Sequence, residues 1–199
     1  MSSAMWDARY AASQVWDLEP SQFVAQPLQK VRRGHALDLG CGEGRHAIWL
    51  ASKGWRVTAV DQSMVAISAL QGRAAVLGLE VEALVADATS YSPSPHAYDL
   101  ALLAYLQLPV EGLKLVLGAA ARALRVGGRL LLVAHDQSNI DQGVGGPQDP
   151  DLLTNPHVVA GMLTDLGLEV TRAEVVRRHV DSTVGFRVAL DHVVDAIRP

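Results

Sequence analysis

The sequence contains a single cysteine, Cys41, and it is acidic rather than basic. One cysteine excludes an internal disulfide, and no spacing of cysteine and histidine resembles that of a zinc site, so no metal is expected. The formal net charge of −4 argues against a broad nucleic-acid-binding surface, which is usually strongly basic. The basic runs at 30–33 and 177–178 are short. We therefore expect no nucleic acid partner.

Long apolar runs are also missing. No stretch approaches the roughly 20 apolar residues that are needed to span a bilayer. The first residues lack the basic and then apolar profile of a signal peptide. These absences predict a cytoplasmic protein without a membrane partner. Apolar residues still make up 49% of the 199 positions, which suits one domain with a sizeable core.

Short apolar segments alternate with amphipathic ones along most of the chain. Helical spacing of apolar residues predicts helices at 44–53, 63–77 and 111–124, the second of them capped by Ser63. Strands are expected at 35–39, 55–60, 80–85, 97–104 and 129–134, the last after a turn at Gly127-Gly128. This alternation predicts a mainly parallel sheet with helices on both faces.

The C-terminal third breaks the alternation. A long polar loop spans 136–153, and Asn155-Pro156 then predicts the start of a helix that runs to Leu166. Two final strands, 168–178 and 185–193, are joined by a short polar link at 181–183, which predicts an antiparallel edge hairpin. The expected fold is a Rossmann-like three-layer α/β sandwich with a seven-stranded sheet. It forms one domain, 1–199, in which an N-terminal flap (1–27) precedes the core (28–199).

A glycine-rich loop follows the first strand. The strand ends in Leu37-Asp38-Leu39 and continues as Gly40-Cys41-Gly42-Glu43-Gly44. In open α/β sheets, ligands bind beyond the carboxyl ends of the strands, where glycine lets a ligand approach the backbone. The spacing is G-x-G-x-G, and Arg45 stands where a dinucleotide site has its third glycine. Asp38 would also repel a pyrophosphate, so the loop favours a cofactor with an ammonium group and no phosphates.

The second and third strands end in aspartate as the first does. Asp61 follows the second strand, where a carboxylate accepts hydrogen bonds from ribose hydroxyls in nucleoside-binding sheets. Asp87 ends the third strand, within reach of the exocyclic amine of an adenine. Each aspartate alone would also suit a helix cap or a turn. Three successive strands with this ending form the strongest functional signal in the chain.

The order of these motifs resembles class I S-adenosylmethionine-dependent methyltransferases. The likeness covers 36–134 and includes the glycine loop, the aspartates, 98–103 and 124–133. It implies S-adenosylmethionine as cofactor and S-adenosylhomocysteine as product. In that family the loop holds the methionine part, the acidic residue after the second strand holds the ribose, and the residues after the third and fourth strands face adenine and the methyl group. The implied cofactor-binding residues are Asp38, Gly40, Cys41, Gly42, Gly44, Arg45, Asp61, Gln62, Asp87, Ala88, Ala104 and Tyr105.

A narrower resemblance lies near the N-terminus. The chain is also similar to tellurite-resistance-like and thiopurine-like small-molecule methyltransferases. The likeness lies in segment 6–10 (Trp-Asp-Ala-Arg-Tyr), Trp16, Pro20 and segment 42–47. It implies that the N-terminal segment helps to close the cofactor site. The C-terminal part departs from the tellurite-resistance pattern in its loop rich in Gly, Asp and Gln, so the acceptor stays open.

Catalytic candidates follow the fourth and fifth strands. His135 is the best candidate for a general base, because histidine titrates near physiological pH, and Tyr105 lies nearby in the expected fold. Asp136 is a candidate for orienting His135, although adjacent strand residues point to opposite faces. His46 is a second pocket candidate, and a purely structural role is open for both histidines. The loop 136–153 is long enough to be a lid over the acceptor.

The sequence thus predicts methyl transfer to a small-molecule acceptor. The segment 104–109 lacks an Asn-Pro-Pro-Tyr-like motif, which argues against methylation of nucleobase or glutamine amino groups. Two alternatives remain: a non-catalytic S-adenosylmethionine-binding protein, and a nicotinamide-dependent oxidoreductase, against which the loop spacing argues.

Overall fold

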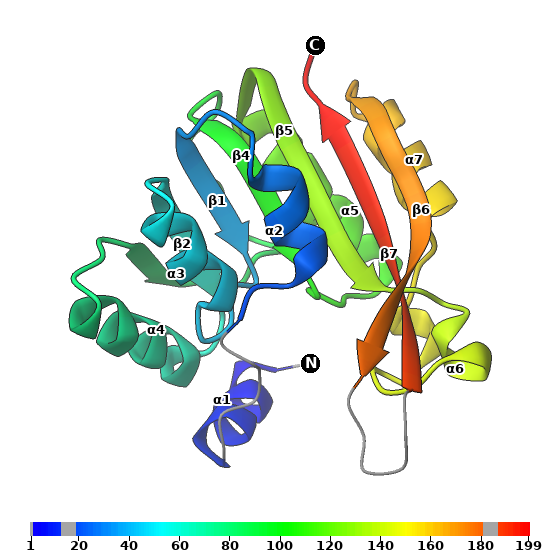
Figure 1. Ribbon diagram of the computed structural model, residues 1–199, viewed down its shortest axis with the longest axis horizontal. Coiled ribbons are helices and arrows are strands. Elements are labelled where there is room, and N and C mark those ends of the chain that lie inside the picture. Colours follow the sequence, from blue (N-terminus) through cyan, green and yellow to red (C-terminus); the bar gives the residue numbers. More distant parts are fainter. Residues whose placement is uncertain (1, 13–18, 181–186) are drawn as a thin grey trace.

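The computed structural model describes residues 2–12, 19–180 and 187–199. Its centre is a seven-stranded sheet in the order β3-β2-β1-β4-β5-β7-β6 (Figure 1). The first five strands are parallel, and β7 runs antiparallel to both of its neighbours. This confirms the predicted fold class. The strands are β1 (His35–Leu39), β2 (Arg56–Asp61), β3 (Glu82–Val85), β4 (Tyr98–Ala104), β5 (Leu124–His135), β6 (Glu169–Val180) and β7 (Arg187–Ile197).

Helices cover both faces of the sheet. On one face lie α2 (Gln22–Leu28), α3 (Arg45–Ser52) and α4 (Met64–Val76); on the other lie α5 (Val110–Ala123) and α7 (Pro156–Asp165) (Figure 1). Each face has its own apolar cluster, because successive strand residues point to opposite sides. In β4, for example, Leu100 and Leu102 pack toward α3, whereas Leu103 packs toward α5.

The helix starts follow their predicted caps. The Ser63 hydroxyl accepts the Ala66 N–H at 3.1 Å at the start of α4. Asn155 Oδ1 accepts the N–H groups of residues 157 and 158, both at 3.0 Å, at the start of α7. Side-chain caps of this kind stabilise a helix by about 1 kcal/mol.

Two segments differ from the predicted elements. The β5 strand begins at Leu124 and passes through the glycines that were predicted as a turn; its register against β4 shifts there, and Gly127 has φ +76°. The β7 strand continues to Ile197, because its C-terminal half is buried between β5 and β6. The predicted loop 136–153 contains two short helices, α6 (Asn139–Gln142) and a 3-10 turn (Pro150–Leu152). The predicted link at 181–183 and Trp16 lie outside the described residues.

The N-terminal helix α1 (Ser3–Ala12) stands at the carboxyl edge of the sheet (Figure 1). Asp7 Oδ1 accepts the Ser63 hydroxyl at 2.5 Å and the Val65 N–H at 3.2 Å, and these bonds lower the pKa of Asp7. Val24 of α2, by contrast, is fully buried in the core. Within the segment predicted as a flap, α1 is thus the helix that contacts the start of α4 at the carboxyl edge of the sheet.

Two buried histidines predict how stability depends on pH. Burial lowers the pKa of His46 to about 3 and that of His192 to about 4, while the unfolded chain titrates near 6.5. Their stabilising contribution is present above pH 6.5 and is lost as the pH falls toward 4. Asp38 opposes them, because burial raises its pKa to about 7 and protonation then favours the folded state. These three groups alone predict a net loss of roughly 3 kcal/mol between pH 6.5 and 4.

Urea unfolding measured from pH 8 to pH 4.5 checks this loss. His46→Gln keeps an acceptor for the Ser21 N–H, which the His46 Nε2 accepts at 3.3 Å, and removes one of the two titrating histidines. Its stability should therefore change little over the same range. A variant that loses as much stability as the parent chain would show that His46 does not contribute.

Candidate active site

The glycine loop after β1 has a backbone that only glycine adopts readily. Gly40, Gly42 and Gly44 have φ values of +74°, +54° and +84°. A Cβ on Gly44 would stand 2.1 Å from Leu70 Cδ1, so there is also no space for a side chain. The N–H of Gly40 donates to the Val60 carbonyl at 2.8 Å, which holds the loop against the end of β2.

Asp61 ties the glycine loop to the start of α4. One carboxylate oxygen accepts the Gly42 N–H and the other accepts the Ser63 N–H, both at 2.9 Å. Burial raises the pKa of Asp61, and these backbone donors oppose that shift. Each oxygen can accept a further hydrogen bond, so the carboxylate suits a pair of neighbouring hydroxyls. Gln62, the next residue, is partly buried beside it.

Asp38 is a buried carboxylate that lacks a full set of partners. Its side chain is 1% exposed, and its Oδ2 has no hydrogen bond within the described part of the chain. Burial, and then the charge of Asp61, raise the pKa of Asp38 to about 7, while the charge of Arg45 opposes the shift. An incompletely paired buried carboxylate is costly. The position therefore fits a cationic group supplied by a ligand.

The other cofactor candidates lie along the same edge. Asp87 is exposed after β3, and its Oδ1 accepts the backbone N–H and the hydroxyl of Thr89, both at 2.8 Å. Ala88, which follows Asp87, is buried, and so is Ala104 at the end of β4. Cys41 is buried, which raises the pKa of its thiol and argues against a nucleophilic role.

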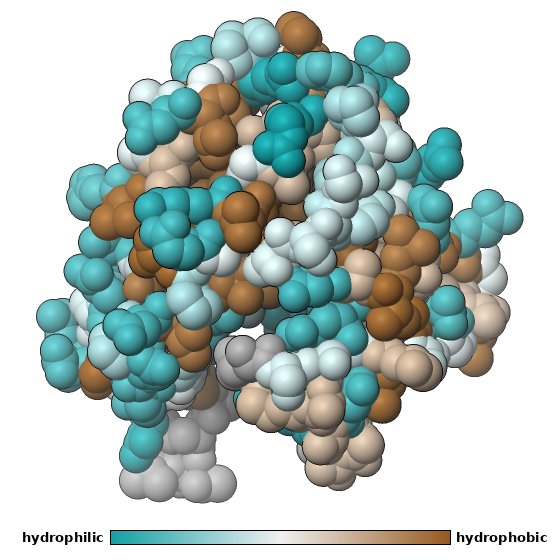
Figure 2. Space-filling model, turned by 180° about the vertical axis from the view of Figure 1, so that it is seen from behind, coloured by the Kyte–Doolittle hydropathy of each residue, from teal (hydrophilic) through white to brown (hydrophobic). Residues whose placement is uncertain are grey.

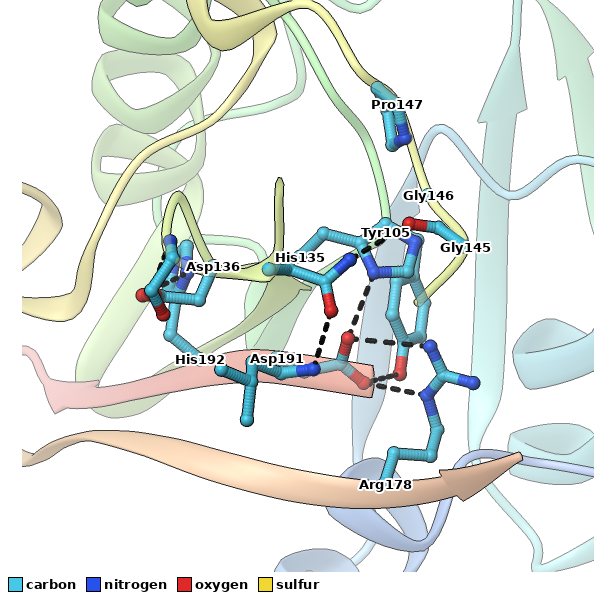
Figure 3. A network of polar contacts seen from close by, with 12 residues as sticks. Tyr105, His135, Asp136, Gly145, Gly146, Pro147, Arg178, Asp191 and His192 are labelled. Carbon is cyan, nitrogen blue, oxygen red and sulfur yellow. Dashed lines mark hydrogen bonds and ion pairs between the residues drawn. The ribbon is translucent and has the colours of Figure 1, made fainter. Parts of the chain in front are cut away.

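Three polar side chains converge on the carboxylate of Asp191 (Figure 3). His135 Nδ1 lies 2.9 Å from Oδ1, and the Tyr105 hydroxyl donates to Oδ2 at 2.8 Å. Arg178 donates from Nε to Oδ2 at 2.7 Å. These residues come from β5, from the residue after β4, from β6 and from β7. Asp191 faces His135 because the two are partners in the antiparallel β5–β7 register.

The charges in this cluster are well defined. Burial alone would raise the pKa of Asp191, but the hydrogen bonds from His135 and Arg178 outweigh it and lower the pKa, so this carboxylate stays ionised. Burial and the Asp191 charge raise the pKa of Tyr105 to about 12, so its hydroxyl stays a donor. An ionised acceptor at Nδ1 selects the imidazole tautomer that carries its proton there. His135 Nε2 is then left with a lone pair, which is the requirement for a general base.

Tyr105 links this cluster to the glycine loop. It has φ +60°, which is uncommon for a residue with a side chain, and its N–H donates to the Val133 carbonyl at 2.7 Å. Its ring lies 5.2 Å from that of His135, centre to centre. The guanidinium of Arg45 lies 5.6 Å from the ring centre. Tyr105 thus lies between His135 and Arg45, the residue that directly follows the glycine loop.

The structure bears on two candidates that the sequence left open. Asp136 does not orient His135: it points to the opposite face, where its Oδ2 lies 3.6 Å from Nδ1 of the buried His192. Asp191 orients His135 instead. His46 is buried, and its Nε2 accepts the Ser21 N–H. The signal for Asp191 was present in the sequence as three ionisable residues, Asp191, His192 and Asp195, inside the apolar strand β7.

The surface near these residues is hollowed. Seen from behind, the lower edge of the molecule carries a hollow beside α1, below the carboxyl ends of the parallel strands (Figure 2).

None of the helices in the described ranges is long and apolar enough to cross a membrane.

Known proteins share both the sequence pattern and the fold. Residues 36–128 match the model of a family described as a methyltransferase domain. One similar structure comes from work on the conversion of a disulfide bond into a thioacetal group during echinomycin biosynthesis. Its sequence is 22% identical to this chain, and the TM-score is 0.78. The match covers 98% of this chain and 92% of that one. TehB from Haemophilus influenzae is 17% identical, with a TM-score of 0.73 and coverages of 98% and 67%.

A third similar structure holds a cofactor product. It is phosphoethanolamine N-methyltransferase 2 from Haemonchus contortus, in complex with phosphomonomethylethanolamine and S-adenosylhomocysteine. It is 18% identical, with a TM-score of 0.69, and the match covers 89% of this chain and 52% of that one. At these identities the solved structures establish the fold, and the family model adds the methyltransferase domain itself. Residues 36–128 therefore carry the sequence pattern of a methyltransferase domain, and the chain has the fold of a structure that binds S-adenosylhomocysteine.

Proposed function

We propose that this protein is an S-adenosylmethionine-dependent methyltransferase that acts on a small-molecule acceptor whose reacting group must lose a proton, and that His135 is the base. The observation that carries the proposal is the contact of 2.9 Å between His135 Nδ1 and the buried carboxylate of Asp191. A histidine held in this way by a carboxylate has its other nitrogen directed toward a substrate. Nothing of this kind is needed to bind the cofactor alone.

The cofactor-binding roles follow from the geometry of the carboxyl edge. In this proposal Asp61 accepts the ribose hydroxyls, Asp38 faces the methionine ammonium group, and Gly40, Gly42 and Gly44 let the methionine part approach the backbone. Asp87 and Ala88 lie at the adenine, and Ala104 and Tyr105 lie at the methyl end. When bound, S-adenosylmethionine supplies an electrophilic methyl group on a sulfonium.

The protein's own contribution is orientation and proton removal. Asp191 fixes the imidazole, and Nε2 of His135 takes the proton from an O–H, N–H or S–H group of the acceptor. The resulting imidazolium stays hydrogen-bonded to Asp191. Positioned bases of this kind contribute about 10²- to 10⁴-fold in rate. An acceptor that is already an anion would gain little from this arrangement, so we favour a protonated one.

Two further observations support a small acceptor. The phosphoethanolamine enzyme, a structural relative, is named for a small acceptor, and geranyl diphosphate methyltransferase, another structural relative, was solved with GPP and sinefungin. The net charge of −4 also makes a nucleic acid substrate unfavourable.

We further propose that α1 closes the cofactor side of the site. We also propose that the protein acts in the cytoplasm.

Binding of S-adenosylhomocysteine should depend on pH through Asp38. Only an ionised Asp38 attracts the ammonium group, and its pKa in the free protein is about 7. We expect the affinity to fall about tenfold for each pH unit below 7. Calorimetric titrations between pH 8 and pH 5.5 measure this, and Asp38→Asn should bind weakly at every pH. An affinity that does not change with pH would remove Asp38 from the ammonium site.

A transfer assay tests the proposed function. The protein is incubated with S-adenosylmethionine labelled in the methyl group and with panels of thiols, phenols, alcohols, amines and oxyanions, and labelled product is counted. Transfer to at least one protonated acceptor, with a rate that rises with pH in the wild type, supports the proposal. Binding of S-adenosylhomocysteine without transfer to any acceptor would favour the non-catalytic alternative. Transfer only to oxyanions would contradict the role of His135.

A further inference from the structure

Asn139, which no part of the proposed reaction uses, is one of the most buried polar residues. Its side chain is 1% exposed, and both ends of its amide are engaged. Oδ1 accepts the Leu190 N–H at 2.7 Å, and Nδ2 donates to the Gly145 carbonyl at 2.8 Å. A side chain with this arrangement connects a strand to a loop that lies six residues further along the chain.

The strand end of this connection lies beside the catalytic pair. The last pair of the β5–β7 ladder is His135 and Asp191, and the Asp136 N–H then donates to the Leu190 carbonyl at 2.9 Å. The chain leaves the sheet at that point. Asn139 Oδ1 supplies the acceptor for the Leu190 N–H that a continuing strand would have supplied. Asn139 is therefore fixed to the strand that carries Asp191.

The loop end of the connection lies over the face of the His135 ring. A Cβ on Gly146 would stand 2.9 Å from Cδ2, 3.0 Å from Cγ and 3.1 Å from Nε2 of His135, so the backbone of this loop covers the side of the ring that carries the proposed base. Gly145 and Gly146 have φ values of +71° and +74°. A Cβ on Gly143 would stand 1.9 Å from Asn139 Oδ1, so glycine is also needed where the loop passes over Asn139. In Figure 3 the imidazole lies between Asp191 and this loop.

We propose that Asn139 is a positioning residue for methyl transfer. It holds segment 143–147 at a set distance from His135 Nε2, so that this backbone forms one wall of the acceptor site and limits what reaches the base. The inference rests on the proposed role of His135. It goes further, because it names the wall of the acceptor site and the single side chain that sets its distance.

Asn139→Asp separates the two halves of the connection. The carboxylate keeps an oxygen for the Leu190 N–H but places a second oxygen against the Gly145 carbonyl, which releases the loop. Protonation of that carboxyl restores a donor, so the effect should disappear as the pH falls. Gln142→Glu is the matched control, since it makes the same amide-to-carboxylate change on an exposed side chain of the same short helix.

The probe is diethyl pyrocarbonate, which acylates unprotonated imidazoles, with modification of His135 followed by peptide mass spectrometry. At pH 8 we expect His135 to react about tenfold faster in Asn139→Asp than in the wild type, as expected for the loss of one hydrogen bond. The ratio should be smaller at pH 6 than at pH 8, and Gln142→Glu should match the wild type throughout. Equal rates in Asn139→Asp and the wild type at both pH values would overturn the inference.

A second variant serves if Asn139→Asp does not fold. Gly146→Ala adds a Cβ that would stand 2.9 Å from the His135 ring at a φ of +74°, so the loop must move away from the ring although Asn139 is intact. We expect faster acylation of His135; an unchanged rate would mean that this backbone does not shield the ring. Neither experiment needs an acceptor. Wild-type protein that fails to transfer methyl groups would count against the proposed function, whereas unaltered His135 reactivity in both variants counts only against the role of Asn139.

Discussion

Replacing His135 with asparagine should lower the rate of methyl transfer by about 10²- to 10⁴-fold, the range expected for loss of a positioned base. Asparagine can still hydrogen-bond to Asp191, so the loss isolates the basic nitrogen. The affinity for S-adenosylhomocysteine should stay within about threefold of the wild type, because the residues proposed to bind the cofactor are untouched. The measurement is turnover of the best acceptor from the transfer assay, followed from pH 6 to pH 9.

The matched control for this prediction is His157→Asn. His157 is an exposed histidine in the first turn of α7 and lies outside the proposed site. Its turnover should equal that of the wild type. Asp191→Asn should also reduce turnover, because it no longer selects the tautomer of His135 and leaves Arg178 without its charged partner. Turnover in His135→Asn close to the wild-type value would refute a base at this position.

The affinity for S-adenosylhomocysteine should fall by at least about 100-fold in Asp61→Ala. Two charge-assisted hydrogen bonds to the ribose would be lost, each typically worth about 1.5–3 kcal/mol. The same change frees the N–H groups of Gly42 and Ser63, which hold the glycine loop to α4. Asp61→Asn keeps one acceptor oxygen, so its affinity should lie between those of the wild type and Asp61→Ala. Calorimetric titration gives all three affinities.

Asp165→Ala is the control for the aspartate change. Asp165 is exposed at the end of α7, on the far face of the sheet from the glycine loop. It should bind the product as tightly as the wild type. If Asp61→Ala also bound normally, the ribose would have to lie elsewhere, and the assignment of the whole carboxyl edge would fail with it.

The placement of the proposed cofactor residues at one edge of the sheet was predictable because each part of that edge is local. Asp38 and Asp61 end strands whose apolar residues are contiguous in the sequence, and the glycines between them need positive φ whatever the rest of the fold does. A parallel sheet then brings these ends to one edge without further information. The same reasoning explains why the helix caps at Ser63 and Asn155 were predictable.

The contact between His135 and Asp191, the proposed catalytic pair, was only half predictable. His135 ends a strand and was visible, but its partner lies 56 residues later and faces it only through the antiparallel register of β5 and β7. Asp136 is nearer in sequence, yet the alternation of side chains along a strand turns it toward His192. Local patterns do not give the register between distant strands.

The loop after β5 was visible only as a long polar segment. Its ordering depends on Asn139, whose partners Leu190 and Gly145 are 51 residues and six residues away. The bulge at Gly127 was similarly hidden, because a glycine pair predicts a turn as readily as a bulge within a strand. Both features are set by tertiary contacts.

A crystal structure of the protein with S-adenosylhomocysteine tests the central claim most directly. We predict the ribose on Asp61, the ammonium group beside Asp38, and the sulfur atom directed toward the space beside Tyr105 and His135. That arrangement would place the transferred methyl group where His135 can remove the proton of an acceptor. A sulfur atom directed away from His135, or a product bound without contact to Asp61, would contradict the account.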